Sequence, residues 1–270
     1  MKVFLVLIVL LCKPLVSFYY QPWLPDFAEV NFATTPSLSY FPSVNNGINP
    51  NHFSATTYRI QCNLSSQFLP MFEGQVESDF FKSRKKNWLL ERFGVMIRKS
   101  IYDDVVGDPL SMAVGVKSYF IPTKSLKDVT VPYLSQGNME LNISLGKEID
   151  TIYNWDYRFW SYCGLGFCNK KTFYINPEIH IEAMLGKFQK LHLSFDSSIG
   201  FGDSKQVNIN HFNGYAKIAY RSIDIDLEYA YLLRIWGMLS AKVSRRVLGI
   251  NFPENETKLQ LSYILPFSVV

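Results

Sequence analysis

The chain has little charge, few cysteines and no long apolar run beyond its first residues, and each shortage excludes a class of protein. Asp, Glu, Lys and Arg make up 19% of its 270 residues, below the roughly 25% that is typical of soluble domains. The net charge is only +4, and Lys2 and Lys13 belong to the leader described below. A positive charge this weak and scattered does not indicate a nucleic-acid partner.

Beyond the leader only Cys62, Cys163 and Cys168 remain, an odd number that does not form a disulfide framework. Cys163 and Cys168 are five residues apart and would face opposite sides of one strand, so a bridge between them would need a turn at Gly164–Gly166. Whether they are bridged stays open here. No CxxC pair is present, and no apolar run beyond the leader approaches the 18 residues of a membrane-spanning helix.

The first residues have the pattern of a secretory signal peptide. Lys2 precedes the ten apolar residues Val3–Cys12, and Leu15–Ser17 offers a cleavage site. An uncleaved anchor is the alternative, although ten helical residues are too short to cross a hydrocarbon core of about 30 Å. We therefore expect a signal peptide at residues 1–17. No linker, repeat or low-complexity tract divides residues 18–270, so we expect one domain there.

Period-two alternation dominates the remaining chain and predicts long strands. The clearest runs are Asn138–Ile149, Phe173–Leu185 and Ser222–Leu233, in which large apolar residues alternate with carboxylates, amides and histidine. The runs extend over nine to thirteen residues, whereas soluble strands average about five or six and a tilted strand needs about 9–11 to cross a bilayer. A polar lumen and an apolar outside are typical of a membrane barrel, which must close because unpaired strand edges are costly in lipid.

We count thirteen candidate strands, and because single-chain bacterial barrels have even numbers we expect about twelve, with ten or fourteen as alternatives. The weakest candidate is the first, because Pro36 interrupts it. The candidates start near Ala28, Ser54, Phe72, Leu89, Leu110, Met139, Trp155, Phe173, Leu191, Val207, Ile223, Met238 and Leu259. The predicted fold is an all-β, closed antiparallel transmembrane barrel, and a soluble secreted β-sandwich is the rival fold.

The alternation assigns side chains to the two faces of this barrel. Candidate lumen residues are Glu140, Glu148, Glu178, His180, Glu182, Asp224, Asp226 and Glu228. Aromatic residues near strand ends suit a girdle at the lipid headgroups, where an apolar ring and a polar tip are both satisfied. The candidate girdle residues are Trp155, Tyr157, Tyr229, Tyr231, Trp236, Tyr263 and Phe267.

The chain closes on alternating apolar residues that include Leu259, Leu261, Tyr263, Leu265 and Phe267. This ending resembles that of outer-membrane proteins, which the outer-membrane assembly machinery recognises, although Phe267 is followed by three further residues. The resemblance implies two partners, the assembly machinery and the lipid bilayer of a Gram-negative outer membrane.

Several segments together resemble an uncharacterised outer-membrane β-barrel family of chlamydia-like bacteria. They are "DDVVGDPLSMAVGV" (Asp103–Val116), "HFNGYAKI" (His211–Ile218), "SIDIDLEY" (Ser222–Tyr229), "IWGMLS" (Ile235–Ser240), "RRV" (Arg245–Val247), "FPEN" (Phe252–Asn255) and "YILPF" (Tyr263–Phe267). The resemblance implies a β-rich protein of the cell envelope. It supplies no catalytic or binding residues, because the family has no assigned activity.

Catalytic motifs are missing. The sequence has no HExxH, GxSxG or phosphate-binding loop. His180 and Glu182 share one strand face, and His192 with Ser194 could lie on the next strand, but hydrated lumen residues are a better interpretation of them than a metal or nucleophile site. We therefore expect no enzymatic activity, no cofactor and no metal.

Three functions fit these observations. The preferred one is a porin-like channel for passive diffusion of small solutes, supported by the polar lumen. The second is a structural or adhesive envelope protein, with the loops Phe41–His52 and Pro122–Gly137 as contact surfaces. The third is a membrane-embedded hydrolase that uses rim carboxylates or His180 and His192. Paired interior charges would give a plugged cylinder and a wider lumen would give a pore, and the oligomeric state is open.

Overall fold

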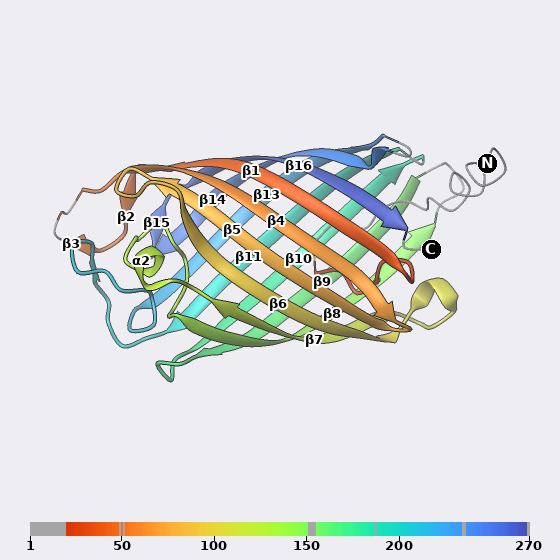
Figure 1. Cartoon of the computed structure of the whole chain (residues 1–270), viewed down its shortest axis with the longest axis horizontal. Helices are drawn as coiled ribbons and strands as arrows, with labels where there is room; N and C mark the ends of the chain where they lie inside the picture. Colours follow the sequence, from red (N-terminus) through yellow and green to blue (C-terminus); the bar gives the residue numbers. More distant parts are fainter. Residues whose placement is uncertain are drawn as a thin grey trace.

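The computed structural model describes residues 20–48, 50, 52–150, 155–186, 188–233 and 236–268. The expected signal peptide at residues 1–17 lies outside this part of the chain. Twelve long strands of the described residues form one closed antiparallel barrel (Figure 1). Among the same residues, no helix has the length and apolarity that a membrane crossing requires.

The barrel strands run in chain order around the wall, and β1 closes the sheet by pairing with β16. They are β1 (Glu29–Phe41), β4 (Ala55–Leu69), β5 (Phe72–Ser83), β6 (Leu89–Tyr102), β7 (Ser111–Phe120), β8 (Gly137–Asp150), β9 (Trp155–Cys168), β10 (Phe173–Leu185), β11 (Gln189–Phe201), β13 (Ala219–Leu232), β14 (Met238–Ile250) and β16 (Thr257–Ser268). Closure leaves no open edge, so every strand has two neighbours. The predicted closed barrel of about twelve strands is confirmed, and the β-sandwich is excluded.

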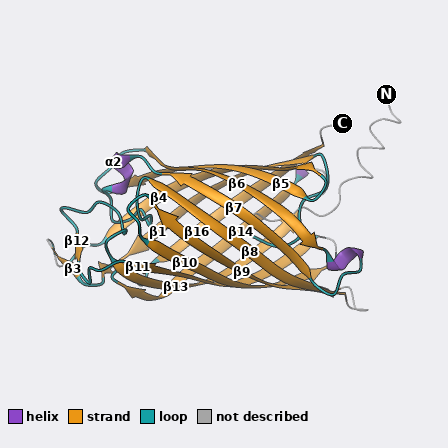
Figure 2. Cartoon of the chain, turned by 90° about the horizontal axis from the view of Figure 1, so that it is seen from below, coloured by secondary structure: helices purple, strands orange, loops and turns teal. Residues whose placement is uncertain are grey.

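The two ends of the barrel differ in their connections (Figure 2). The longer connections lie at one end, here called the loop end, and three of them carry the short strands β2 (Ser43–Val44), β3 (Gly47–Ile48), β12 (Val207–Asn208) and β15 (Pro253–Glu254). Helix α2 (Thr123–Leu126) lies at the same end. The opposite end, here called the terminal end, holds the start of β1, the end of β16 and the 3-10 helix η1 (Asp104–Val106).

Side-chain burial follows the alternation along each strand. In β13, Asp226 is only 3% exposed, whereas its neighbour Leu227 is 52% exposed. The buried side of a closed barrel is its lumen, so the carboxylates face inward and the apolar residues face outward. This arrangement inverts that of a soluble sheet protein and defines a membrane barrel.

The prolines inside strands sit where the hydrogen-bonded ladder is interrupted. β1 pairs with β16 on both sides of Thr35 and Pro36 but not at these two residues, and β10 omits Asn176 and Pro177 from its pairing with β11 in the same way. Proline lacks the N–H that a central ladder needs, so each gap accommodates one. Choosing the strand with Pro36 as the weakest of the thirteen was therefore wrong.

The surplus candidate strand is the one expected near Val207. Val207–Asn208 form only the two-residue strand β12, which pairs in parallel with β3 outside the barrel sheet. Val207 and Ile209 are buried in an apolar cluster with side chains from other loop-end connections. Their alternation serves that cluster and not the barrel wall.

Candidate functional site

Ion pairs between side chains of neighbouring strands line the lumen wall. Antiparallel register places Asp79 of β5 opposite Arg92 of β6, and Arg92 donates to Asp79 at 2.6 Å and to Glu77 at 2.7 Å. Glu77 also pairs with the fully buried Lys117 at 2.5 Å. Charges removed from water need such partners, because an uncompensated buried charge costs several kcal/mol.

A second set of ion pairs lies on the lumen side of β13 and β14. Arg246 donates to both oxygens of Asp224, at 2.7 and 2.8 Å, and to Glu256 at 2.6 Å. Glu256 lies just before β16 at the loop end. Burial raises the pKa of its carboxyl, but Arg246 and Arg59 outweigh this, and the pKa of Glu256 is lowered overall. Glu256 therefore stays ionised at neutral pH.

The eight candidate lumen residues all lie on the inner side of the wall, and they belong to several groups. Glu140, His180, Glu182, Asp226 and Glu228 are buried, while Glu148, Glu178 and Asp224 are half-buried. Their partners are Tyr162 and Asn176 for Glu140, Arg158 for Glu148, His180 for Glu178, His192 for His180, Lys190 for Glu182, Arg246 for Asp224 and Lys242 for Asp226. Glu228 faces His192 at 3.8 Å.

The seven candidate girdle residues all lie towards the terminal end of the barrel. Trp155 starts β9, Tyr229 and Tyr231 are near the end of β13, and Trp236 is in the following turn. Exposed aromatic residues also lie at the loop end, and the sequence argument named none of them. They are Tyr40, Tyr58, Phe80, Phe120, Phe167, Phe173 and Phe201. Their position at strand ends, the same signal that selected the other seven, would have revealed them.

Cys163 and Cys168 are both free thiols. Cys163 is exposed and Cys168 is buried, as opposite faces of β9 require. Cys163 and Cys168 therefore form no disulfide in this structure.

An apolar cluster fills the lumen at the loop end. Residues from four connections and the adjoining strand ends meet in it: Phe41, Val44, Phe53, Ala55, Val129, Leu134, Cys168, Tyr174, Val207, Ile209, Phe212, Tyr215, Ala216, Ile218, Tyr220 and Phe252. At its centre Tyr215 is 0% exposed, and its hydroxyl donates to the Val129 carbonyl at 2.9 Å. The loop between β7 and β8 is thereby joined to the loop between β11 and β13.

The loop between β7 and β8 turns inward over the lumen. The Ser125 hydroxyl donates to the Leu90 carbonyl, and Arg59 in the wall donates to the Thr130 carbonyl, both at 2.5 Å. Backbone hydrogen bonds from Tyr215 and Ala216 to Tyr133 and Leu134 attach the neighbouring loop to it. Gly214, with φ of +80°, lies against Leu134 there and has no space for a side chain. The loop end is therefore closed by side chains of the chain itself.

The N-terminal described residues close the lumen from the terminal end. Tyr20 stacks on Tyr162 with ring centroids 4.4 Å apart, and the Gln21 carbonyl accepts from Arg98 at 2.7 Å. Trp23 meets Trp160 edge to face at 6.0 Å and donates its indole N–H to Asp104 at 2.8 Å. Residues 20–25 therefore occupy lumen space between the wall strands.

Gly146 of β8 makes room for this segment. A Cβ atom at this position would lie 2.7 Å from Pro22 and 2.8 Å from Trp23. A side chain there would displace the segment from the wall.

A cavity of about 280 Å³ remains inside the barrel, below the loop between β7 and β8. Thr130, Pro132 and Tyr133 of that loop line it on one side. The wall contributes Thr35, Ser37, Arg59, Gln61, Asp79, Glu91, Arg92, Asp196, Asp224, Asp226, Lys242, Ser244, Arg246, Lys258 and Gln260. The Lys258 ammonium has no carboxylate of the described residues within 4.0 Å. The cavity is thus a polar chamber with charges of both signs.

The fold and this lumen define the class of the protein: it is an outer-membrane-type β-barrel with a charged interior. Solved structures agree. The chain is similar to the COG4313 outer membrane channel from Pseudomonas putida F1, with 12% identity, a TM-score of 0.61 and coverage of 94% of this chain and 100% of that chain. It is also similar to the NanC porin, with 8% identity, a TM-score of 0.53 and coverage of 86% and 98%.

A further likeness is to the translocator domain of the autotransporter NalP from Neisseria meningitidis, with 8% identity, a TM-score of 0.51 and coverage of 91% and 90%. At these identities the likeness shows the fold alone. No protein-family model matches the chain, and no curated protein matches it by sequence. The resemblance to the family of chlamydia-like bacteria stays a prediction.

Proposed function

We propose that the protein is an outer-membrane channel that passes small polar solutes by passive diffusion when the closures at both ends of the lumen, the loop-end cluster and residues 20–25, move aside. The observation that carries this proposal is the polar cavity of about 280 Å³ inside the barrel, because a cylinder plugged throughout by paired interior charges would leave no such space. The channel and the porin among the similar folds add support. The loop end faces outward in this proposal, since barrels of this class have longer extracellular connections.

The proposal includes the route to the membrane. Residues 1–17 act as a secretory signal peptide, and the apolar last strand is recognised by the outer-membrane assembly machinery. The exposed aromatic belts at both barrel ends lie at the two headgroup levels of the bilayer.

A catalytic role is not part of the proposal. The Ser194 hydroxyl is buried and has no hydrogen-bond partner among the described residues. A serine nucleophile needs a base within hydrogen-bond reach, and the described geometry does not provide one for Ser194.

Single-channel recording in planar bilayers tests the channel. Wild-type protein is compared with a variant in which Lys124–Ser135 is replaced by a short Gly/Ser linker and residues 20–25 are deleted. We expect brief, rare openings for the wild type and long openings for the variant, since the chamber then connects to both ends of the barrel. The control replaces Arg84, Lys85 and Lys86 by Ser, which changes charge in a turn at the same end but leaves the chamber intact.

A second candidate function has its own observation. The tightly packed apolar cluster at the loop end favours a closed cylinder that presents its loops as a structural or adhesive surface. If neither the wild type nor the variant with the replaced loop conducts, although both shift on a gel before and after boiling, this second function takes the place of the channel.

A further inference from the structure

Three carboxylates stand in a row across neighbouring strands of the lumen wall. Asp196 of β11 is in register with Glu178 of β10 on one side and with Asp224 of β13 on the other. Like charges directly opposite each other destabilise a sheet. Arg246 neutralises Asp224 through two hydrogen bonds, but no Lys or Arg of the described residues lies within 4.0 Å of the carboxylates of Glu178 and Asp196.

Asp196 faces a further carboxyl group, that of Asp226, with which its side chain shares a hydrogen bond, while Lys242 attracts it without a direct ion pair. Two carboxyl groups can share a hydrogen bond only if one of them carries a proton. The row of carboxylates therefore holds either a bound proton or a cation in its place.

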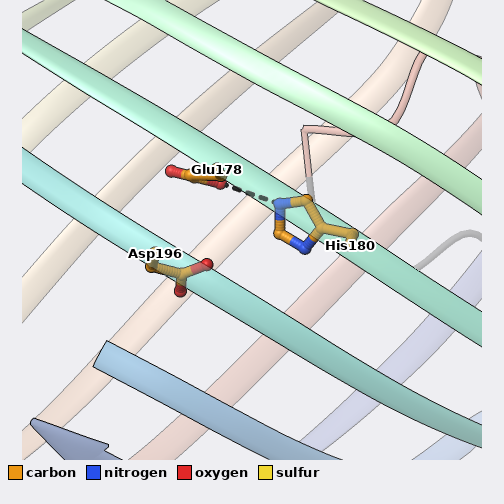
Figure 3. A group of neighbouring side chains, drawn as sticks. All are labelled: Glu178, His180 and Asp196. Atoms are coloured by element: carbon orange, nitrogen blue, oxygen red, sulfur yellow. Dashed lines mark hydrogen bonds and ion pairs between the residues drawn. The ribbon is translucent and has the colours of Figure 1, made fainter. Parts of the chain in front are cut away.

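His180 completes a group that could hold a metal ion. One ligand atom each from Glu178, His180 and Asp196 lies within 4.8 Å of the other two (Figure 3). His180 Nε2 is 3.0 Å from Glu178 Oε2, and Figure 3 shows the imidazole and both carboxylates converging from two neighbouring strands.

The surroundings of His180 fit a ligand histidine. Its other ring nitrogen, Nδ1, is 3.2 Å from His192 Nε2, and His192 Nδ1 faces Glu228 at 3.8 Å. If the His180 proton resides on Nδ1 and is donated to His192, Nε2 presents its lone pair to the site. Ligand histidines typically donate their second N–H in this way, which fixes the tautomer and the ring.

Aromatic stacking holds the same ring in place. Trp160 lies parallel to His180, with centroids 4.8 Å apart and an interplanar angle of 8°, and also to His192 at 5.2 Å and 5°. The three rings come from β9, β10 and β11. His180 is only 1% exposed, so its orientation is set by packing before any ion binds.

We propose that Glu178, His180 and Asp196 form a binding site for a divalent transition-metal ion of the Zn²⁺ type on the lumen wall. Two carboxylates and one imidazole suit Zn²⁺ better than Ca²⁺, since Ca²⁺ takes oxygen ligands and gains nothing from the ring. Three protein ligands leave a fourth coordination position for water or a solute group. Asp196 also lines the lumen cavity, which gives the site access to the chamber.

The test is metal binding by the folded barrel in detergent, with Zn²⁺ alone as the probe. Protein stripped with a chelator is titrated calorimetrically, and cobalt absorption reports nitrogen and oxygen ligation. We expect one Zn²⁺ per chain, at least a tenfold loss of affinity in Glu178→Gln and in Asp196→Asn, and weaker binding of Ca²⁺. The His192→Phe variant, which removes the partner of Nδ1, should lose 10- to 100-fold.

The matched control is Glu182→Gln, a buried glutamate on the same face of β10 that is paired with Lys190 at 3.3 Å. It should bind Zn²⁺ as the wild type does. All variants are first checked for the gel shift of a folded barrel. If a variant does not fold, the test rests on the affinities of the wild-type protein for Zn²⁺ and for Ca²⁺. The assignment is overturned if the wild type binds no Zn²⁺, if both carboxylate variants bind it unchanged, or if Ca²⁺ binds as tightly. Conductance plays no part in this test, so its outcome is independent of the proposed channel.

Discussion

The two ends of the lumen are closed by different chemistry. At the loop end, distant segments meet in an apolar cluster around Tyr215 and Phe252, whose rings lie 4.8 Å apart. At the terminal end, residues 20–25 are held by separate polar contacts, among them the indole of Trp23 on Asp104 and the carbonyl of Gln21 on Arg98. The first closure depends mainly on area removed from water, whereas the second combines two ring contacts, on Tyr162 and Trp160, with individual hydrogen bonds.

This difference predicts how each closure opens. An apolar cluster loses its packing as a unit, because a truncated side chain leaves a cavity beside all its neighbours. A segment held by separate hydrogen bonds loosens in small steps, each worth about 1 kcal/mol. We therefore expect the loop-end closure to open in one step and the terminal-end closure to open in several smaller steps.

The largest expected effect is that of Tyr215→Ala. The change removes a fully buried ring and the hydrogen bond to Val129, and truncation of a buried aromatic residue costs roughly 3–5 kcal/mol. Limited proteolysis should cut the loops at residues 121–136 and 202–218 much faster, while the barrel keeps its gel shift. The control is Tyr58→Ala, at a half-exposed ring on the outer face; equal cleavage in both variants would contradict the central position of Tyr215.

Trp23→Phe should have a smaller effect at the opposite end. Phe keeps most of the ring contact with Trp160 but loses the hydrogen bond to the Asp104 carboxylate, which is worth about 1.5 kcal/mol because the acceptor is charged. Hydrogen exchange of the amides in residues 20–26 should speed up about tenfold, with no change at Tyr215. Trp88→Phe, at an exposed ring, is the matched control. A loss of protection at both ends would mean that the two closures are coupled.

The barrel wall could be predicted from the sequence, but the two closures could not. Period two is a local signal, so the faces of Asp226 and Leu227 follow from their order along β13. The meeting of Tyr215 with Val129 joins residues 86 positions apart, and no local pattern encodes it. The same alternation at Val207 and Ile209 served a loop-end cluster, which is why one expected strand was wrong.

The candidate site was predictable in part. The alternation placed Glu178 and His180 on the lumen face, but Asp196 was not among the candidates. Its strand alternates too, with His192, Ser194 and Asp196 between Leu191, Leu193 and Phe195. That pattern was a usable signal. The register that sets Asp196 opposite Glu178 depends on the turn between β10 and β11, and the sequence did not determine it.

The smallest expected effect is a change with pH at the terminal end. Burial raises the pKa of the Asp104 carboxyl, but hydrogen bonds from the Ser111 hydroxyl, the Glu148 amide and the Trp23 indole outweigh it, so the pKa lies below its usual value. A group with a lowered folded pKa stabilises the fold fully above the unfolded value of about 3.9 and loses this contribution as the pH falls through the folded value. The contact of Trp23 with Asp104 should therefore be constant from pH 8 to about pH 4 and weaken only below that.

The indole N–H signal of Trp23 in an NMR spectrum of labelled protein measures this directly, and Trp23→Phe identifies the signal by its disappearance. We expect its position to move only below about pH 4 and to lose that dependence in Asp104→Asn, while the indole signal of Trp88 stays constant. A midpoint near pH 6 would assign the titration to a histidine and would contradict the predicted role of Asp104 in holding Trp23. Because the ring packing against Trp160 does not titrate, the segment should stay in the lumen even after Asp104 is protonated, and only its polar contact should be lost.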